Sequence, residues 1–182
     1  MSDFYQVGVF TTMHNLGMPE ALERLEAELV THGRQRPTAL LLPALFSEFE
    51  GPAMPGIIAE LAQVPYLKRI VVSLDRADRA QFDTARRAFD KVSTPVTVVW
   101  HDGPRLQALY REILANDLPI GEQGKGRSCW MTYGSIIGEA DCQVIALHDS
   151  DIVTYDRSML ARLCYPVTNP TMGYMFAKGF YP

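Results

Sequence analysis

Two carboxylates, Asp149 and Asp151, stand one residue apart directly after the apolar run 143–147 (QVIAL). Such a run is typical of a buried strand, and open α/β folds bind their ligands at the carboxyl ends of their strands. Two neighbouring carboxylates repel each other unless a cation or a shared proton compensates them. The pattern therefore indicates a divalent-cation site with open positions for water and phosphate, as Mg²⁺ prefers. A turn in which Asp149 caps a helix or binds local amides is the alternative.

A glycine-rich segment, 121–126 (GEQGKG), places Lys125 between two glycines where a helix is expected to begin. A lysine, unpaired backbone amides and the helix dipole could together hold a diphosphate at that point. The segment is not a P-loop, because Gly126 follows the lysine where a P-loop has Ser or Thr, and no strand precedes it. A flexible loop with a solvated lysine is the alternative interpretation.

Polar side chains also follow two other apolar runs, with Ser47 and Glu48 beyond 38–42, and Asp75 and Arg76 beyond 70–74. If the strands are parallel, these side chains share one edge of the sheet with the two aspartates. An acidic residue just after a strand can accept hydrogen bonds from a ribose or a base. Capping of the following helix is the alternative, equally favoured for Asp75 and preferred for Asp78.

The elements that must position these residues alternate along the chain. Apolar runs predict strands at 38–42, 70–74, 96–100 and 143–147, and helical spacing predicts helices at 18–32, 52–63, 79–92, from 103 through 113, and 127–140. Strands separated by helices predict an α/β fold, a mostly parallel Rossmann-like sheet with helices on both faces, in a single domain spanning 1–182. In the last predicted helix, Trp130, Met131 and Tyr133 are expected to face the core.

The composition narrows the class of protein. At 182 residues and 47% hydrophobic side chains the chain can bury one core, and its net charge of -4 argues against nucleic-acid or anionic-membrane binding. Three cysteines without metal-ligand spacing indicate free thiols in the cytoplasm. No run reaches the length of a membrane span. We expect a cytoplasmic protein whose phosphate ligands are held by local charges or a metal.

Five motifs together resemble the family 81 glycosyltransferases of the GT-A fold: LLPALFSEFEGPA, IVVSLDRAD, GKGRSCW, ALHDSDI and KGFY, in this order between 38 and 181. The resemblance implies a retaining, metal-dependent enzyme that uses Mg²⁺ or Mn²⁺. It would move a hexosyl group, above all glucose, from a nucleotide-diphosphate sugar such as UDP-glucose to a small phosphorylated acceptor such as 3-phosphoglycerate. No residue stands out as a nucleophile, so attack on the face from which the leaving group departs is implied.

The same resemblance assigns roles to residues of this chain. It places Pro43, Ala44, Leu45 and Glu48, with Ser47 as the alternative to Glu48, beside the base and ribose, and Asp75 or Arg76 against uracil or ribose. It places Lys125 on the donor's phosphate or sugar. Asp151 becomes the principal metal ligand, with Asp149 as the second acidic group, and Asp149 and Ser150 face the ribose and sugar. Asp149, Asp151 and Lys125 are the predicted catalytic residues.

The family continues beyond the point that corresponds to Pro182, with an acceptor-binding loop and a further metal-binding histidine. We therefore expect a donor-binding part, truncated at the C-terminus and inactive by itself, with a homodimer as a possible assembly. One alternative is a phosphatase of the haloacid dehalogenase type, with Asp149 as nucleophile and Asp151 as acid and base. Val153, where that class has threonine, and the late position of the motif oppose it. A non-catalytic nucleotide-binding fragment is the other alternative.

Overall fold

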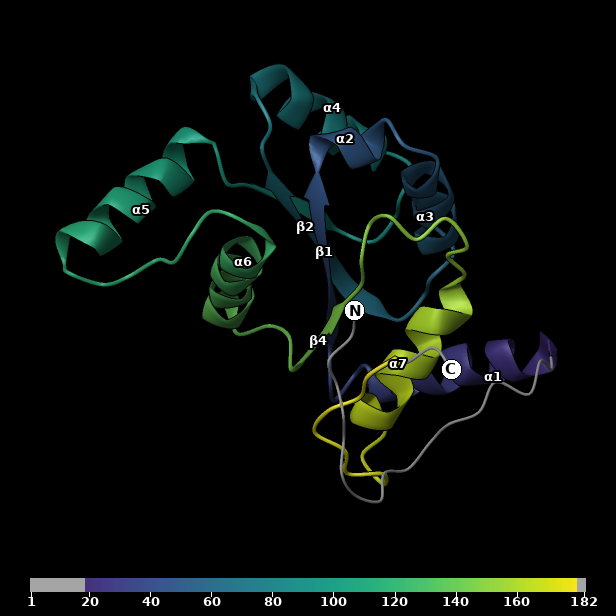
Figure 1. The fold of residues 1–182 in the computed structure, drawn as a ribbon. Helices are drawn as coiled ribbons and strands as arrows, with labels where there is room; N and C mark the ends of the chain where they lie inside the picture. The colour runs from purple at the N-terminus through teal and green to yellow at the C-terminus, as the bar shows by residue number, and fades with distance from the viewer. Residues whose placement is uncertain (1–18, 180–182) are drawn as a thin grey trace.

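A computed structural model of the protein describes residues 19–179, which contain a parallel sheet of four strands in the order β3-β2-β1-β4 (Figure 1). The strands are β1 (Thr38–Leu45), β2 (Leu67–Asp75), β3 (Val96–Trp100) and β4 (Val144–Leu147). Strands β1, β2 and β3 contain the apolar runs that predicted them, and β4 begins at Val144, one residue after the start of its predicted run 143–147. The motif KGFY extends past the last described residue, and Met18 of the first predicted helix also lies outside the described range.

Helices cover both faces of this sheet, which confirms the predicted α/β architecture (Figure 1). They are α1 (Pro19–His32), α2 (Phe46–Phe49), α3 (Ala53–Leu61), α4 (Arg79–Ala88), α5 (Pro104–Ala115), α6 (Lys125–Glu139) and α7 (Arg157–Thr168). Leu40 and Leu42 of β1 pack on the side of α1, α3 and α7, whereas Ala39 and Leu41 pack on the side of α6. Successive residues of β1 thus meet opposite helix layers, which explains why the strand is apolar at every position.

Strand β1 continues through Pro43, although the sequence predicted that the strand would stop there. The Leu41 carbonyl accepts a hydrogen bond from the His148 backbone on the β4 side, and Pro43, two residues later, faces the same side. Pairing with β4 ends at Leu41, so no ladder bond on that side requires an N–H from Pro43. The proline therefore costs the sheet no hydrogen bond.

Several predicted boundaries were also wrong. Helix α6 begins at Lys125 rather than Arg127, α4 ends at Ala88 rather than Val92, and α2 and α7 were not predicted. Asp78 caps α4 by accepting a hydrogen bond from the Gln81 backbone at 2.9 Å, which confirms its preferred interpretation. Caps of this kind stabilise a helix by about 1 kcal/mol.

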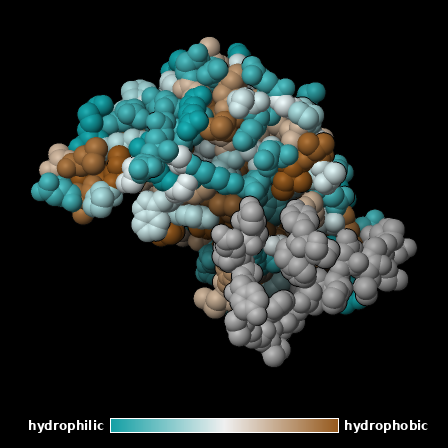
Figure 2. Space-filling view, viewed as in Figure 1, coloured by the Kyte–Doolittle hydropathy of each residue, from teal (hydrophilic) through white to brown (hydrophobic). Residues whose placement is uncertain are grey.

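Helices α5 and α6 both carry exposed apolar side chains, and for Trp130 of α6 the prediction was wrong. Trp130, predicted to lie in the core, is 73% exposed, while Ser128 and Thr132 are buried on the opposite face of α6. Helix α5 extends away from the sheet (Figure 1), and Figure 2 shows apolar surface over it, to which Leu109 and Leu114 contribute.

Across residues 19–179, no helix is both long and apolar enough to cross a bilayer.

Candidate functional site

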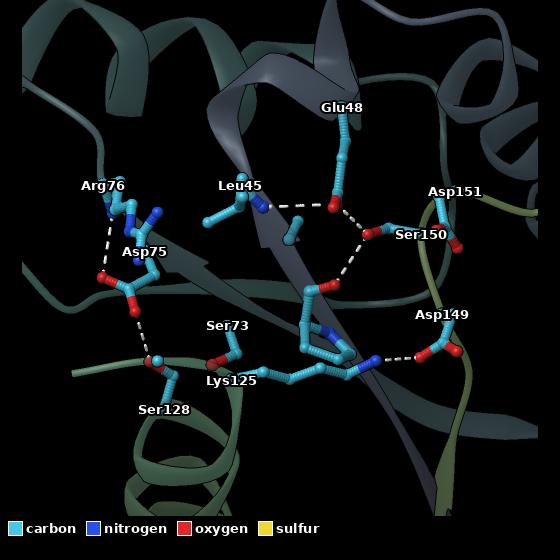
Figure 3. A pocket seen from close by; sticks show the side chains of 13 residues that line it. Leu45, Glu48, Ser73, Asp75, Arg76, Lys125, Ser128, Asp149, Ser150 and Asp151 are labelled. Atoms are coloured by element: carbon cyan, nitrogen blue, oxygen red, sulfur yellow. Dashed lines mark hydrogen bonds and ion pairs between the residues drawn. The ribbon is translucent and has the colours of Figure 1, made fainter. Parts of the chain in front are cut away.

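A pocket of about 190 Å³ opens at the carboxyl ends of β1, β2 and β4. Its lining contains every residue predicted for the site except Ser47, which is exposed and lies outside it (Figure 3). The lining residues are Pro43, Ala44, Leu45, Glu48, Ser73, Asp75, Arg76, Gly124, Lys125, Ser128, Asp149, Ser150 and Asp151. Segments more than 100 residues apart in the chain meet here because parallel strands end at the same edge of their sheet.

One wall of the pocket is built by Glu48, Ser150 and the end of β1. The Glu48 carboxylate accepts a hydrogen bond from the Leu45 backbone at 3.2 Å and is also bound by the Ser150 hydroxyl. The same hydroxyl lies 2.6 Å from the Pro43 carbonyl, so two acceptors share its single proton, and Ser150 is only 2% exposed. Ser150 therefore ties the loop after β4 to β1, in a place where β4 itself no longer pairs.

Lys125 and Asp149 form an ion pair across the opening of the pocket, with about half of each side chain exposed (Figure 3). Lys125 is the first residue of α6, so its side chain starts at the positive end of the helix dipole. Partial burial lowers the pKa of Lys125, but the hydrogen bond and charge of Asp149 outweigh that effect and the pKa is raised. Asp149 thus binds a lysine rather than local amides, and Lys125 belongs to a helix and is paired, although more than half of its side chain is exposed.

Asp151 is exposed and lies beside Asp149 on the loop after β4 (Figure 3). Within residues 19–179 its carboxylate makes no hydrogen bond or ion pair, and no group of three or more His, Cys, Asp or Glu side chains in that range could hold a metal ion. Two carboxylates facing one pocket suit Mg²⁺ or Mn²⁺, which accept water and phosphate oxygens in their other positions. The donor set of this pocket therefore fits a cation shared with an anionic ligand.

Asp75, at the end of β2, is 4% exposed and binds the start of α6. One carboxylate oxygen accepts hydrogen bonds from the Arg76 backbone at 2.9 Å and the Gln123 amide at 3.1 Å, and the other accepts the Ser128 hydroxyl at 2.7 Å. Burial raises the pKa of Asp75, but these hydrogen bonds outweigh it and the pKa is lowered. Asp75 therefore does not cap a helix, the alternative that the sequence left open.

A buried histidine lies beneath the pocket, and the sequence did not single it out. His101 follows β3 directly and is 1% exposed; its ring nitrogens lie 2.8 Å from the Ser73 hydroxyl and 2.6 Å from the Tyr110 hydroxyl. The Thr132 hydroxyl donates to Ser73 at 2.9 Å, which connects the group to α6. The rule that polar residues after parallel strands converge, applied to β3, would have drawn attention to His101.

We expect His101 to make folding stability depend on pH. Burial lowers the pKa of His101, outweighing Asp75 and Asp102, which raise it. Below a pH of about 6.5 the unfolded chain thus binds a proton that the folded protein does not, and stability falls as the pH falls. The free energy of unfolding in urea should decline less between pH 6.5 and 5 in His101→Asn than in the wild-type protein. The decline in unfolding free energy that remains in His101→Asn is assigned to His148, because burial lowers the pKa of His148 to about 4.

No family model matches the chain. It is 50% identical over 181 residues to glucosyl-3-phosphoglycerate synthase of Persephonella marina, covering 100% of this chain and 45% of that protein. It is 32% identical over 182 residues to the protein of the same name from Methanococcoides burtonii, covering 98% of this chain and 43% of the relative. The chain thus spans less than half the length of these curated relatives.

Solved structures support the same relationship at the level of the fold. Glucosyl-3-phosphoglycerate synthase from Mycobacterium tuberculosis, in complex with Mn²⁺, UDP and glucosyl-3-phosphoglycerate, matches with a TM-score of 0.54 at 19% identity, over 87% of this chain and 47% of that one. The same enzyme with Mn²⁺, UDP and phosphoglyceric acid matches equally, over 46% of its length. The resemblance seen in the motifs is thereby confirmed: over its full length, this chain is similar to the N-terminal part of the glucosyl-3-phosphoglycerate synthases.

Proposed function

We propose that this chain forms the donor-binding part of a glycosyltransferase that moves glucose from UDP-glucose to 3-phosphoglycerate with the help of Mg²⁺ or Mn²⁺. The observation that carries the proposal is the arrangement of Lys125, Asp149 and Asp151 at one pocket, where a lysine that can bind phosphate lies beside two carboxylates that can bind a cation. The relatives named glucosyl-3-phosphoglycerate synthase and the Mn²⁺ and UDP in the related crystal structures support it.

In this proposal each side chain has a distinct role. Asp151 and Asp149 would hold the cation, and the cation when bound would neutralise charge on the donor's diphosphate. Lys125 would leave Asp149 and donate to the diphosphate, stabilising the negative charge that develops as the glycosidic bond breaks. Glu48 would face the base and ribose, in a position fixed by Leu45 and Ser150.

The size of the pocket fits a donor-binding part. Pockets that enclose a ligand of this size usually measure about 300–1,000 Å³, whereas this one measures about 190 Å³. The described residues would thus enclose only a portion of a nucleotide sugar. A single domain over 1–182, retention of anomeric configuration, a cytoplasmic location and a homodimer belong to the same proposal and remain predictions.

A phosphatase of the haloacid dehalogenase type is not favoured, because both curated relatives are glucosyl-3-phosphoglycerate synthases. Release of phosphate from p-nitrophenyl phosphate would contradict this conclusion. A non-catalytic nucleotide-binding fragment differs from the proposed enzyme only in turnover, which an assay for glucosyl-3-phosphoglycerate separates.

Thermal unfolding with a panel of UDP-, GDP- and ADP-glucose, each with Mn²⁺ or with EDTA, tests donor binding. A ligand at 100 times its Kd stabilises the folded state by about 2.7 kcal/mol, which raises the Tm of a protein of this size by roughly 5–10 °C. We expect such a shift for UDP-glucose with Mn²⁺ and a far smaller one with EDTA. Equal shifts in both conditions, or no shift with any donor, would contradict the proposal.

A further inference from the structure

The start of α6 is attached to the end of β2 by two matching pairs of side chains. Asp75 accepts a hydrogen bond from Ser128, and Ser73 accepts one from Thr132. The strand residues are two apart and the helix residues four apart, so each pair lies on a single face of its element. All four side chains are at least 96% buried, and together they fix where α6 begins along the sheet.

Asp75 also binds the segment that leads into α6. Its first carboxylate oxygen accepts the Gln123 amide at 3.1 Å while its second accepts Ser128 at 2.7 Å. Gln123 lies two residues before Lys125 and Ser128 three residues after it, so one buried carboxylate holds the chain on both sides of the lysine. Between them, Gly124 has a φ of 159° in a backbone conformation that side chains other than glycine rarely adopt.

The Lys125 side chain has few contacts of its own that fix its position. Its side chain is 57% exposed, and its direct partner across the pocket is Asp149. A long lysine side chain has roughly 2 kcal/mol of rotamer entropy, so where its ammonium group can reach depends on how firmly the backbone at 125 is held. Within residues 19–179, Asp75 supports this backbone on both sides of Lys125 through Gln123 and Ser128, and Ser73 supports the next turn through Thr132.

We infer that Asp75 is a positioning residue, which acts on the donor through Lys125 rather than by touching the nucleotide itself. This inference rests on the proposed function and deepens it, because it gives different roles to Asp75 and Lys125, which line the same pocket. Three protein groups already bind the Asp75 carboxylate, which leaves it little capacity for a ligand. The resemblance alone would place Asp75 or Arg76 directly against the base or ribose.

A double-mutant cycle tests the inference. The affinity for UDP with Mn²⁺ is measured by calorimetry in the wild type, Asp75→Asn, Lys125→Met and the double variant, and again with Gln123→Ala in place of Asp75→Asn. Residues that act through one another give non-additive effects. We expect Asp75→Asn and Gln123→Ala to weaken binding about tenfold when Lys125 is present, a factor that corresponds to a coupling of about 1.4 kcal/mol. Neither should weaken it further when combined with Lys125→Met.

Hydrogen exchange measured without any ligand gives a second, independent result. Exchange of the backbone amides of 121–128 should speed up in Asp75→Asn and in Gln123→Ala. It should stay unchanged in the matched carboxylate variant Asp102→Asn, since Asp102 binds the neighbouring Ala77 backbone and does not line the pocket. Gln123 is exposed, so its variant should fold even if Asp75→Asn does not.

The two experiments separate failure of this inference from failure of the proposed function. An equal loss of UDP affinity with Lys125 present and with Lys125→Met would overturn the positioning role and show direct contact with the nucleotide. Unchanged exchange at 121–128 would also overturn it. Absence of UDP binding in the wild type would instead refute the proposed function, and hydrogen exchange would still decide whether Asp75 holds the start of α6.

Discussion

Replacing Asp151 with Asn is expected to remove the dependence of UDP binding on a divalent cation. The substitution keeps the shape of the side chain and removes the charge of the carboxylate, which is exposed at the pocket and unpaired within residues 19–179. Loss of a residue that merely supports a metal ligand lowers metal affinity about 10–100-fold, and loss of a ligand should lower it at least as much. Calorimetry with Mn²⁺ and UDP measures the effect.

The matched control for this prediction is Asp90→Asn, which removes an exposed carboxylate beyond the end of α4 and away from the pocket. It should leave the affinity for Mn²⁺ and UDP unchanged. If Asp151→Asn binds UDP equally well with Mn²⁺ and still loses that binding in EDTA, the cation is held elsewhere and the assignment of Asp151 is wrong.

Replacing Lys125 with Met is expected to have opposite effects on the two ligands. Because a hydrogen bond to a charged group contributes about 1.5–3 kcal/mol, UDP affinity with Mn²⁺ should fall roughly 10–150-fold. Affinity for Mn²⁺ alone should rise, since Asp149 would no longer be neutralised by the lysine with which it pairs. Titration of Mn²⁺ followed by electron paramagnetic resonance, with and without UDP, measures both.

Lys68→Met provides the comparison for Lys125→Met. Lys68 is exposed at the start of β2, at the end of the sheet opposite to the pocket, so losing its charge changes the net charge equally without touching the site. Both affinities should match the wild type. A Lys125→Met protein that binds UDP as tightly as the wild type would mean that the lysine serves only to neutralise Asp149.

Much of the fold could be predicted from local apolar patterns, and much of the pocket lining from the parallel topology that these patterns imply. Strands buried on two faces are apolar throughout, as in β1, and the carboxyl ends of parallel strands meet at one edge, which brought Glu48, Asp75 and Asp149 together. The convergence follows from topology alone. It needs no knowledge of how individual side chains pack.

The interpretations that failed depended on contacts between distant segments. The exposure of Trp130 could not be predicted, because α6 turns its polar residues Ser128 and Thr132 inward to bind Asp75 and Ser73. Hydrophobicity alone favours the opposite orientation. Likewise, whether Pro43 ends a strand depends on where β4 stops pairing, which the sequence around Pro43 does not contain.

The order of the strands makes the pocket one of the last parts of the protein to form. Thr38 of the inner strand β1 pairs with Leu67, about 30 residues later, but also with Val144, more than 100 residues later. Contacts between residues so distant in sequence slow folding, because a long loop must close before they are made. During synthesis β1, β2 and β3 can associate first, leaving one edge of β1 unpaired and open to association with other chains. Arrival of β4 covers that edge with a strand of only four residues and brings Asp149 and Asp151 to the pocket in the same step, so the chain completes its pocket as a long apolar edge is replaced by a short one.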